Sequence, residues 1–258
     1  MQQNATQGDR KLKEIDKKKN IRNILLTQQG SSLQKYRLLT AGDVSTSRFI
    51  YYEFITSLLG ARSGGLGILL RRKLYRKLFR SFGRNVIIGR NCVFRHPSRI
   101  TIGDNVVIDD NCIIDARGCE DDGLVLDEGV LISRNCAIQS KGGDIHIGRN
   151  VNLGADSQLV SWGGIRIGDG AAIAGGCYIS AGSYKLDDFS TPISRRVPFT
   201  AGPVIIGSNA WIATRVTILD GVEIGENAVI SAGAVVSNSI KSKAVAHGNP
   251  AKVVFQGR

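Results

Sequence analysis

Residues 206–235 read IGSNAWIATRVTILDGVEIGENAVISAGAV, which divides into five units of six residues. Each unit begins with isoleucine, its second residue is usually small, and its fifth residue is alanine or valine. The same unit can be followed back along the chain, with interruptions, to Ile88. Internal repetition of this kind determines the architecture, so it is considered before any local propensity. The other units begin at Ile102, Ile108, Ile114, Leu126, Ile132, Ile138, Ile147, Leu153, Leu159, Ile167, Ile173, Ile179 and Val236.

One unit of six residues is long enough for a short strand and a corner. The aliphatic first residue and the small fifth residue point inward, and glycine or asparagine eases the turn. Three units close one triangular coil, and successive coils stack through parallel backbone hydrogen bonds about 4.8 Å apart. A single coil cannot bury its own inner face, whereas a stack of coils can. The repeats therefore predict a mainly β protein, a parallel β-helix.

The cysteines fit this repeat. Cys92, Cys112, Cys136 and Cys177 each occupy the fifth, inward position of a unit. Buried apolar surroundings keep a thiol protonated and unreactive, so we predict packing residues rather than nucleophiles, disulfides or zinc ligands. Cys119 lies outside the pattern, beside Glu120, and is expected to be exposed.

Positive charge is concentrated at the N-terminal end. Residues 1–84 carry 18 Lys or Arg and 5 Asp or Glu, a formal charge of +13, whereas residues 85–258 carry 16 and 17, a charge of −1. An anionic lipid surface is the expected partner, and no motif for reading nucleic acid accompanies the charge. Residues 1–30 are predicted to be a mobile charged tail without a secretory signal, so we expect a cytoplasmic location, peripheral on the inner face of the membrane.

Residues 31–85 are predicted to be helical and partly amphipathic. In LLRRKLYRKLFRSFG, residues 69–83, the apolar side chains fall on one side of a helical wheel and most of the cations on the other. Two interpretations are open. The helix of residues 70–82 can lie in the interface of an anionic membrane, or its apolar face can pack on the body of the protein.

The C-terminal third carries a specific resemblance. Residues 203–236, followed by HGNPAKVV at 247–254, resemble the hexapeptide-repeat acyltransferases, specifically the sugar and polysaccharide O-acetyltransferases, over residues 86–256. The resemblance implies a left-handed β-helix over residues 86–240 and a coenzyme-contacting tail over 241–258. It also implies a homotrimer with acetyl-CoA between subunits, a glycan acceptor in polysaccharide biosynthesis, and no metal.

The resemblance implies a catalytic histidine where this chain has Tyr184. The sequence continues as Lys185, Leu186, Asp187 and Asp188 into a long loop over residues 185–203. Tyrosine is a weak base near neutral pH, because its reference pKa is about 10. The candidate bases are therefore Tyr184 assisted by nearby cations, Asp187 or Asp188, or a histidine from elsewhere. The alternative is a trimeric scaffold or binding protein that has lost turnover.

The three histidines are less promising as bases. His96 precedes the first full coil and is expected to have a capping or surface role, and His146 is expected to be a solvated surface residue. His247 matches the family next to the terminal GNPA, which implies a cofactor contact. Their separation also excludes a zinc site of the γ-carbonic anhydrase type, which needs three clustered histidines. The resemblance assigns cofactor contacts to Trp211, Ala213, Ala232, Gly233, His247, Gly248, Asn249, Pro250 and Lys252, with Lys241, Lys243 and Arg258 as further phosphate ligands.

Overall fold

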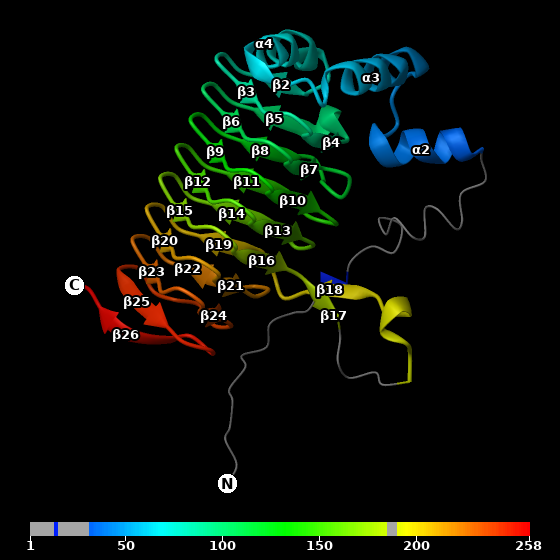
Figure 1. The fold of residues 1–258 in the computed structure, drawn as a ribbon. Coiled ribbons are helices and arrows are strands. Elements are labelled where there is room, and N and C mark those ends of the chain that lie inside the picture. Colours follow the sequence, from blue (N-terminus) through cyan, green and yellow to red (C-terminus); the bar gives the residue numbers. More distant parts are fainter. Residues whose placement is uncertain (1–12, 15–30, 185–189) are drawn as a thin grey trace.

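The computed structural model describes residues 13–14, 31–184 and 190–258, and it shows a triangular prism of stacked parallel strands (Figure 1). The predicted fold, a left-handed parallel β-helix behind a helical N-terminal segment, is confirmed. Three sheets form the sides of the prism, and the chain visits them in turn, so we number them I, II and III in that order.

The strands of sheet I are β2 (Ser81–Phe82), β5 (Ile100–Ile102), β8 (Leu124–Leu126), β11 (Ile145–Ile147), β14 (Ile165–Ile167), β19 (Val204–Ile206) and β22 (Glu223–Ile224). Sheet II contains β3 (Ile87–Ile88), β6 (Val107–Ile108), β9 (Leu131–Ile132), β12 (Asn152–Leu153), β15 (Ala172–Ile173), β20 (Trp211–Ile212), β23 (Val229–Ile230), β25 (Ala244–His247) and β26 (Lys252–Gln256). Sheet III contains β4 (Val93–Arg95), β7 (Ile113–Asp115), β10 (Ala137–Ser140), β13 (Gln158–Ser161), β16 (Tyr178–Ala181), β21 (Thr217–Ile218) and β24 (Val235–Val236). All neighbours pair in parallel except β25 and β26, which pair antiparallel.

The inside of the prism is filled by the first and fifth residues of the units. Ile108, Ile138 and Ile212 have no exposed surface, and the same holds for most of the other isoleucines at the first position. The register explains this burial. Ile114 pairs with Ile138, so side chains of one kind stack along the prism axis and close the core without a second layer of structure.

Asparagine forms many of the corners because it tolerates a positive φ. Asn91, Asn111 and Asn135 occupy the corner between sheets II and III in consecutive coils, with φ of 56°, 61° and 62°. The amide Nδ2 of Asn91 donates to Oδ1 of Asn111 at 3.2 Å, and that of Asn111 donates to Asn135 at 3.3 Å. Each corner thus satisfies the polar groups of the next.

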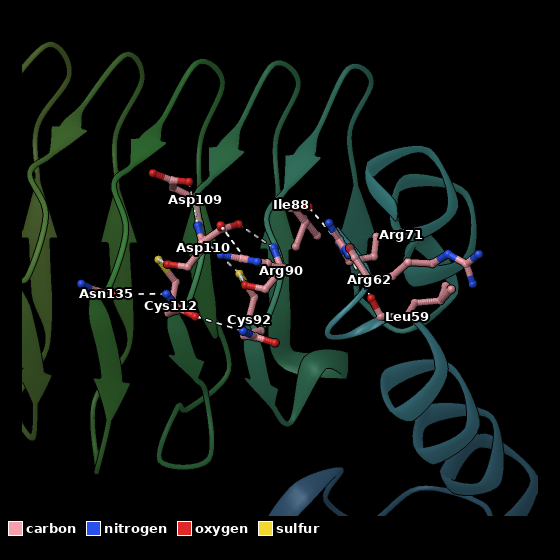
Figure 2. A network of polar contacts seen from close by, with 12 residues as sticks. Leu59, Arg62, Arg71, Ile88, Arg90, Cys92, Asp109, Asp110, Cys112 and Asn135 are labelled. Atoms are coloured by element: carbon pink, nitrogen blue, oxygen red, sulfur yellow. Dashed lines mark hydrogen bonds and ion pairs between the residues drawn. The ribbon is translucent and has the colours of Figure 1, made fainter. Parts of the chain in front are cut away.

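The four cysteines at the fifth position are buried, as predicted. Each thiol donates to a carbonyl of the adjacent coil, for example Cys92 to Asp109 at 3.1 Å (Figure 2) and Cys112 to Ser133 at 3.2 Å. The prediction for Cys119 was wrong, because its side chain is also buried. The segment around it folds onto the next coil, and Arg99 Nη1 donates to its carbonyl at 2.6 Å.

We expect the native thiols to react slowly with a water-soluble disulfide reagent at pH 8. Burial raises the pKa of Cys119 and Cys136 to about 12 and also raises the pKa of Cys177, which favours their protonated form. The hydrogen bond from Cys92 lowers the pKa of Cys112, but Cys112 has no exposed surface and Cys92 is also buried, so a reagent in water cannot reach them. The rate of thiol modification in the native protein checks this, with the urea-unfolded chain as the control in which all five react quickly. A rapid reaction of one native thiol per chain would contradict it.

In the described part of the chain, the helices before the β-helix are α2 (Ser32–Thr40), α3 (Thr46–Leu59) and α4 (Gly64–Leu74), with the 3-10 turn η2 (Tyr75–Lys77) after them. The helix expected over residues 70–82 therefore ends early. Tyr75, Leu78, Phe79 and Phe82 are buried, and Phe79 packs against Phe94 with ring centroids 5.0 Å apart. The second interpretation of this segment is correct, because its apolar face packs on the first coil and is not free for a membrane. No helix in the described part of the chain is long and apolar enough to cross a bilayer.

The guanidinium of Arg71 joins the helices to the first coil (Figure 2). Its side chain is 2% exposed. Nε donates to the carbonyl of Ile88 in β3 at 2.9 Å, and Nη1 donates to the carbonyls of Leu59 and Arg62 at 2.9 and 2.6 Å. The carbonyl of Leu59 lies at the C-terminal end of α3, where a cation is favourable.

A small antiparallel sheet stands beside the prism, where the long loop leaves sheet III. It contains β1 (Lys13–Glu14), β18 (Pro198–Thr200) and β17 (Ser183–Tyr184), in that order. Two further 3-10 turns, η3 (Pro97–Arg99) and η4 (Ile193–Arg195), complete the described elements.

Candidate active site

Tyr184 is the last residue of β17 and lies beside Pro198 of β18 in the loop hairpin. Its side chain is 40% exposed. The hairpin starts at the corner between sheets III and I, two residues after the end of β16. Gly182 is required there, because an added Cβ would come within 2.5 Å of Trp162 in the preceding coil. The indole of Trp162 thus supports the start of the loop.

Asp220 fixes the other end of the hairpin. Its carboxylate accepts from the Thr200 hydroxyl at 2.9 Å and from the Ala201 amide at 2.6 Å. Thr200 is buried, and a Cβ on Gly163 would overlap its hydroxyl. A carboxylate in the next coil therefore holds the strand that pairs with Tyr184. The sequence analysis did not single out Asp220, although its position at the same corner one coil after the loop was a usable signal.

Asp187 and Asp188 lie outside the described residues, as does Lys185. The cations considered as possible assistants of Tyr184 were Lys185, Arg195 and Arg196, and of these Arg196 donates Nε to the carbonyl of Thr191 at 2.8 Å. The hydrogen bond keeps this guanidinium within the loop.

The predicted cofactor residues lie in the last coils. Ala213, Ala232 and Gly233 fall at the corner between sheets II and III, and the amide of Gly233 donates to the carbonyl of Thr214 at 2.9 Å. The amide of Val235 in turn donates to Gly248 at 3.0 Å, which brings the terminal turn to the same corner. A Cβ added to Gly233 would meet no atom within 4 Å, so the space beside it is open.

We call this edge, formed by residues 174–176, 213–215 and 231–233, the small-residue corner. The corresponding corner of earlier coils carries long polar side chains such as Arg90 and Asp110, which pair with each other. From Gly154 onward the corner is mostly alanine and glycine. Arg215 is the longest side chain there, an exposed cation at φ 56° that was not predicted from the sequence.

Trp211 stands next to this corner on the outer face of sheet II, with 54% of its side chain exposed. Ile87 and Leu131 are also exposed on that face, and Val93, Ile113 and Tyr178 are exposed on sheet III. Sheets II and III therefore present partly apolar outer faces.

The remaining cofactor candidates lie at the C-terminal end. His247 and Lys252 are exposed and paired across β25 and β26, with Asn249 and Pro250 in the turn between them. Lys243 Nζ donates to the carbonyl of Arg258 at 2.9 Å, whereas Lys241 is exposed.

The structure separates the two halves of the candidate site within one chain. Strand β16 runs from the small-residue corner at Cys177 to the opposite corner at Ala181, where the Tyr184 hairpin begins. A strand of four residues is about 13 Å long. A ligand on the small-residue corner must therefore cross sheet III to reach Tyr184 of the same chain, or reach Tyr184 of another chain.

The other two histidines lie away from both corners. His96 Nε2 is 2.7 Å from the Leu38 carbonyl, and burial lowers its pKa, so it is a neutral link between α2 and the prism. His146 is exposed on sheet I, 2.6 Å from Oδ2 of Asp127. It lines two adjoining surface hollows of about 570 and 400 Å³ together with Arg166. Within the described residues, no three His, Cys, Asp or Glu side chains gather closely enough to hold a metal ion.

Comparison with known families identifies the repeats. The model of the bacterial transferase hexapeptide (six repeats) matches residues 203–238, and that of the hexapeptide repeat of succinyl-transferase matches residues 81–116 and 144–181. In these stretches the chain carries the hexapeptide repeats of bacterial acyltransferases.

Relatives of known name share part of the chain. A probable acetyltransferase of Mycobacterium tuberculosis is 36% identical over 117 residues, 45% of this chain and 39% of its own length. The galactoside O-acetyltransferase of Escherichia coli is 34% identical over 115 residues, 45% of this chain and 55% of its own length. The chain thus spans about half or less of these relatives. Among solved structures, AntD, an N-acyltransferase from Bacillus cereus in complex with dTDP and 3-hydroxybutyryl-CoA, is 22% identical with a TM-score of 0.46, covering 73% of this chain and 88% of that one.

Proposed function

We propose that this protein is an acyl-CoA-dependent O-acyltransferase that transfers an acetyl group to a sugar hydroxyl of a polysaccharide or lipid-linked glycan. The observation that carries the proposal is the small-residue corner, which is open beside Gly233 and flanked by Trp211. The similarity to a galactoside O-acetyltransferase supports a sugar as the acceptor.

Coenzyme A lies along the small-residue corner in this proposal. The backbone at Ala213, Ala232 and Gly233 is accessible enough for the pantetheine arm to approach it, and Trp211 forms one wall. The terminal turn at Gly248 and Asn249 lies towards the adenosine end, with His247 and Lys252 beside it. Arg215 is a further candidate for the phosphates, because an exposed guanidinium matches their geometry.

A homotrimer would bring the two halves of the site together. Tyr184 and the small-residue corner lie at opposite ends of β16 in one chain, so a neighbouring copy is the simplest source of the second half. The partly apolar outer faces of sheets II and III offer surface for such contacts.

The chemistry requires few groups. A base removes the proton of the sugar hydroxyl while its oxygen attacks the thioester carbon, and the oxyanion then collapses with loss of the coenzyme A thiolate. Tyr184, Asp187 and Asp188 are the proposed candidates for the base. Acyl-CoA is a cytoplasmic metabolite, so the proposed location is the cytoplasm. A trimeric scaffold that binds without turnover is the second candidate, favoured by tyrosine in place of the family histidine.

Blocking the small-residue corner tests the proposal. We expect Ala232→Phe to weaken coenzyme A binding about tenfold or more in isothermal calorimetry, because the new ring fills the space needed by pantetheine. Asn238→Phe is the matched control, since Asn238 is exposed at a different corner of the same coil. Absence of coenzyme A binding by the wild type would overturn the proposed function, and equal binding by both variants would overturn the placement.

A further inference from the structure

Helix α3 presents an apolar ridge that no other element of the described residues covers. Ile50, Phe54 and Leu58 are 61%, 65% and 53% exposed, and their spacing of four residues puts them on one side of the helix. The opposite side, with Phe49, Tyr52, Ile55 and Leu59, is buried against the rest of the protein. Helix α3 therefore packs on the protein through its other side, without using the side chains of the ridge.

Helix α4 adds two exposed leucines, and exposed cations lie on the same helix and on the turns that flank it. Leu66 and Leu69 are exposed on α4, which contacts α3 and lies with it at the N-terminal end of the prism (Figure 1). We define the α3–α4 surface as these five apolar side chains with the exposed cations of the same region, which are Arg62, Arg72, Lys73, Arg76 and Lys77.

The charge of the region is strongly one-sided. Residues 31–84 contain 11 Lys or Arg and 2 Asp or Glu, a formal charge of +9. One of the two acids, Glu53, accepts from the Tyr36 hydroxyl at 3.3 Å. Any partner of this surface must therefore combine an apolar interior with negative charge.

We propose that the α3–α4 surface binds a lipid bilayer that contains anionic lipids. Exposed leucine, isoleucine and phenylalanine side chains insert at the boundary between head groups and acyl chains, and the surrounding cations interact with the anionic head groups. The inserting side chains are those of residues 50–69, and not Tyr75, Leu78, Phe79 and Phe82 of the following segment, which are buried.

Charge favours a membrane over a second copy of the chain. Two α3–α4 surfaces packed face to face would bring two regions of charge +9 together, and like charges oppose that contact. An anionic bilayer offers the opposite charge.

Cyclic symmetry would strengthen the binding. A cyclic trimer keeps equivalent points at the same height along its axis, so its three copies of the surface can meet one plane. Weak binding by each copy then combines into stronger binding by the assembly. The proposal itself requires neither the trimer nor acyl transfer.

Vesicle flotation of the full chain tests the proposal. We expect the wild type to float with vesicles of phosphatidylcholine and phosphatidylglycerol but not with phosphatidylcholine alone, and to dissociate at high salt. Ile50→Ser, Phe54→Ser and Leu58→Ser together are expected to reduce the bound fraction about tenfold. The matched control replaces Val253, Val254 and Phe255 with serine, because these side chains are also exposed but belong to β26 at the other end of the prism.

Two control measurements separate a loss of membrane binding from a loss of folding or a general loss of apolar surface. The urea midpoint of the α3 variant should match that of the wild type, since the three side chains are exposed, and the β26 control should float as the wild type does. Equal flotation of the α3 variant and the wild type would overturn the proposal, as would failure of the wild type to float with anionic vesicles. A third outcome is that the wild type fails to bind vesicles while the α3 variant forms a smaller oligomer than the wild type. That pair of results would overturn the proposal and show instead that the ridge contacts protein.

Discussion

Replacing Arg71 with methionine is expected to lower the free energy of unfolding by about 3 kcal/mol. The substitution keeps the length of the apolar stem but removes the donors to the carbonyls of Leu59, Arg62 and Ile88, which lie at the junction of helices and prism. Burying a guanidinium among carbonyls costs desolvation energy, and methionine removes this cost. The expected decrease in the free energy of unfolding is therefore at the low end of the range for breaking a buried polar network. Urea unfolding followed by circular dichroism measures the change.

The neighbouring residue provides the control for Arg71. Arg72 is exposed and donates Nη2 to Oδ1 of Asn85 at 3.0 Å, so Arg72→Met should cost less than about 1 kcal/mol. Limited proteolysis between α3 and α4 should accelerate only in Arg71→Met. Equal unfolding midpoints for the two variants would show that the buried guanidinium does not hold the helices in place.

Replacing Tyr184 with phenylalanine is expected to lower kcat for acetyl transfer about 100-fold, with little change in KM for acetyl-CoA. The prediction follows from the proposed role of the phenol oxygen in moving the acceptor proton, because the ring itself is retained. Steady-state kinetics with acetyl-CoA and a galactoside acceptor measure both constants.

Tyr178→Phe is the matched control, since Tyr178 is exposed to the same extent on the outer face of β16. It should keep nearly full activity. Full activity in Tyr184→Phe would remove the phenol from the mechanism, and Asp187→Asn and Asp188→Asn would then show which carboxylate is the base.

The β-helix could be predicted because the same pattern of inward aliphatic and small residues recurs every six residues. Ile108 and Ile138 both point inward because each is the first residue of a unit. Since many units indicate the same register, one irregular unit does not change the predicted fold. The four cysteines in the fifth position followed from this register alone.

The N-terminal region could not be predicted in the same way. A helical wheel shows which side chains share a face, but it does not show what covers that face. The wheel of residues 70–82 was compatible with a free or a packed apolar side. In the structure Phe79 and Phe82 pack on the first coil, while Phe54 remains exposed on α3. The prediction that Cys119 is exposed was wrong for a related reason. Its segment does not follow the six-residue repeat, so the repeat does not indicate which way its side chain points.

The residues of the candidate site were predicted from the sequence, but their positions relative to one another were not. Ala213, Ala232 and Gly233 do share one corner, because units three apart stack on each other. That Tyr184 stands at the opposite end of a sheet III strand depends on which corner the loop leaves. Arg215 and Asp220 emerged only from that geometry.

The two ends of the prism differ from its middle, and this affects how the molecules behave when concentrated. Helix α4 lies against β3 at one end, and at the other the antiparallel strand β26 interrupts the parallel ladder. A further copy therefore finds no matching parallel edge in sheet II on which to continue the stack. The chain is built from units that could be added without limit, yet its ends prevent head-to-tail polymerisation into fibres.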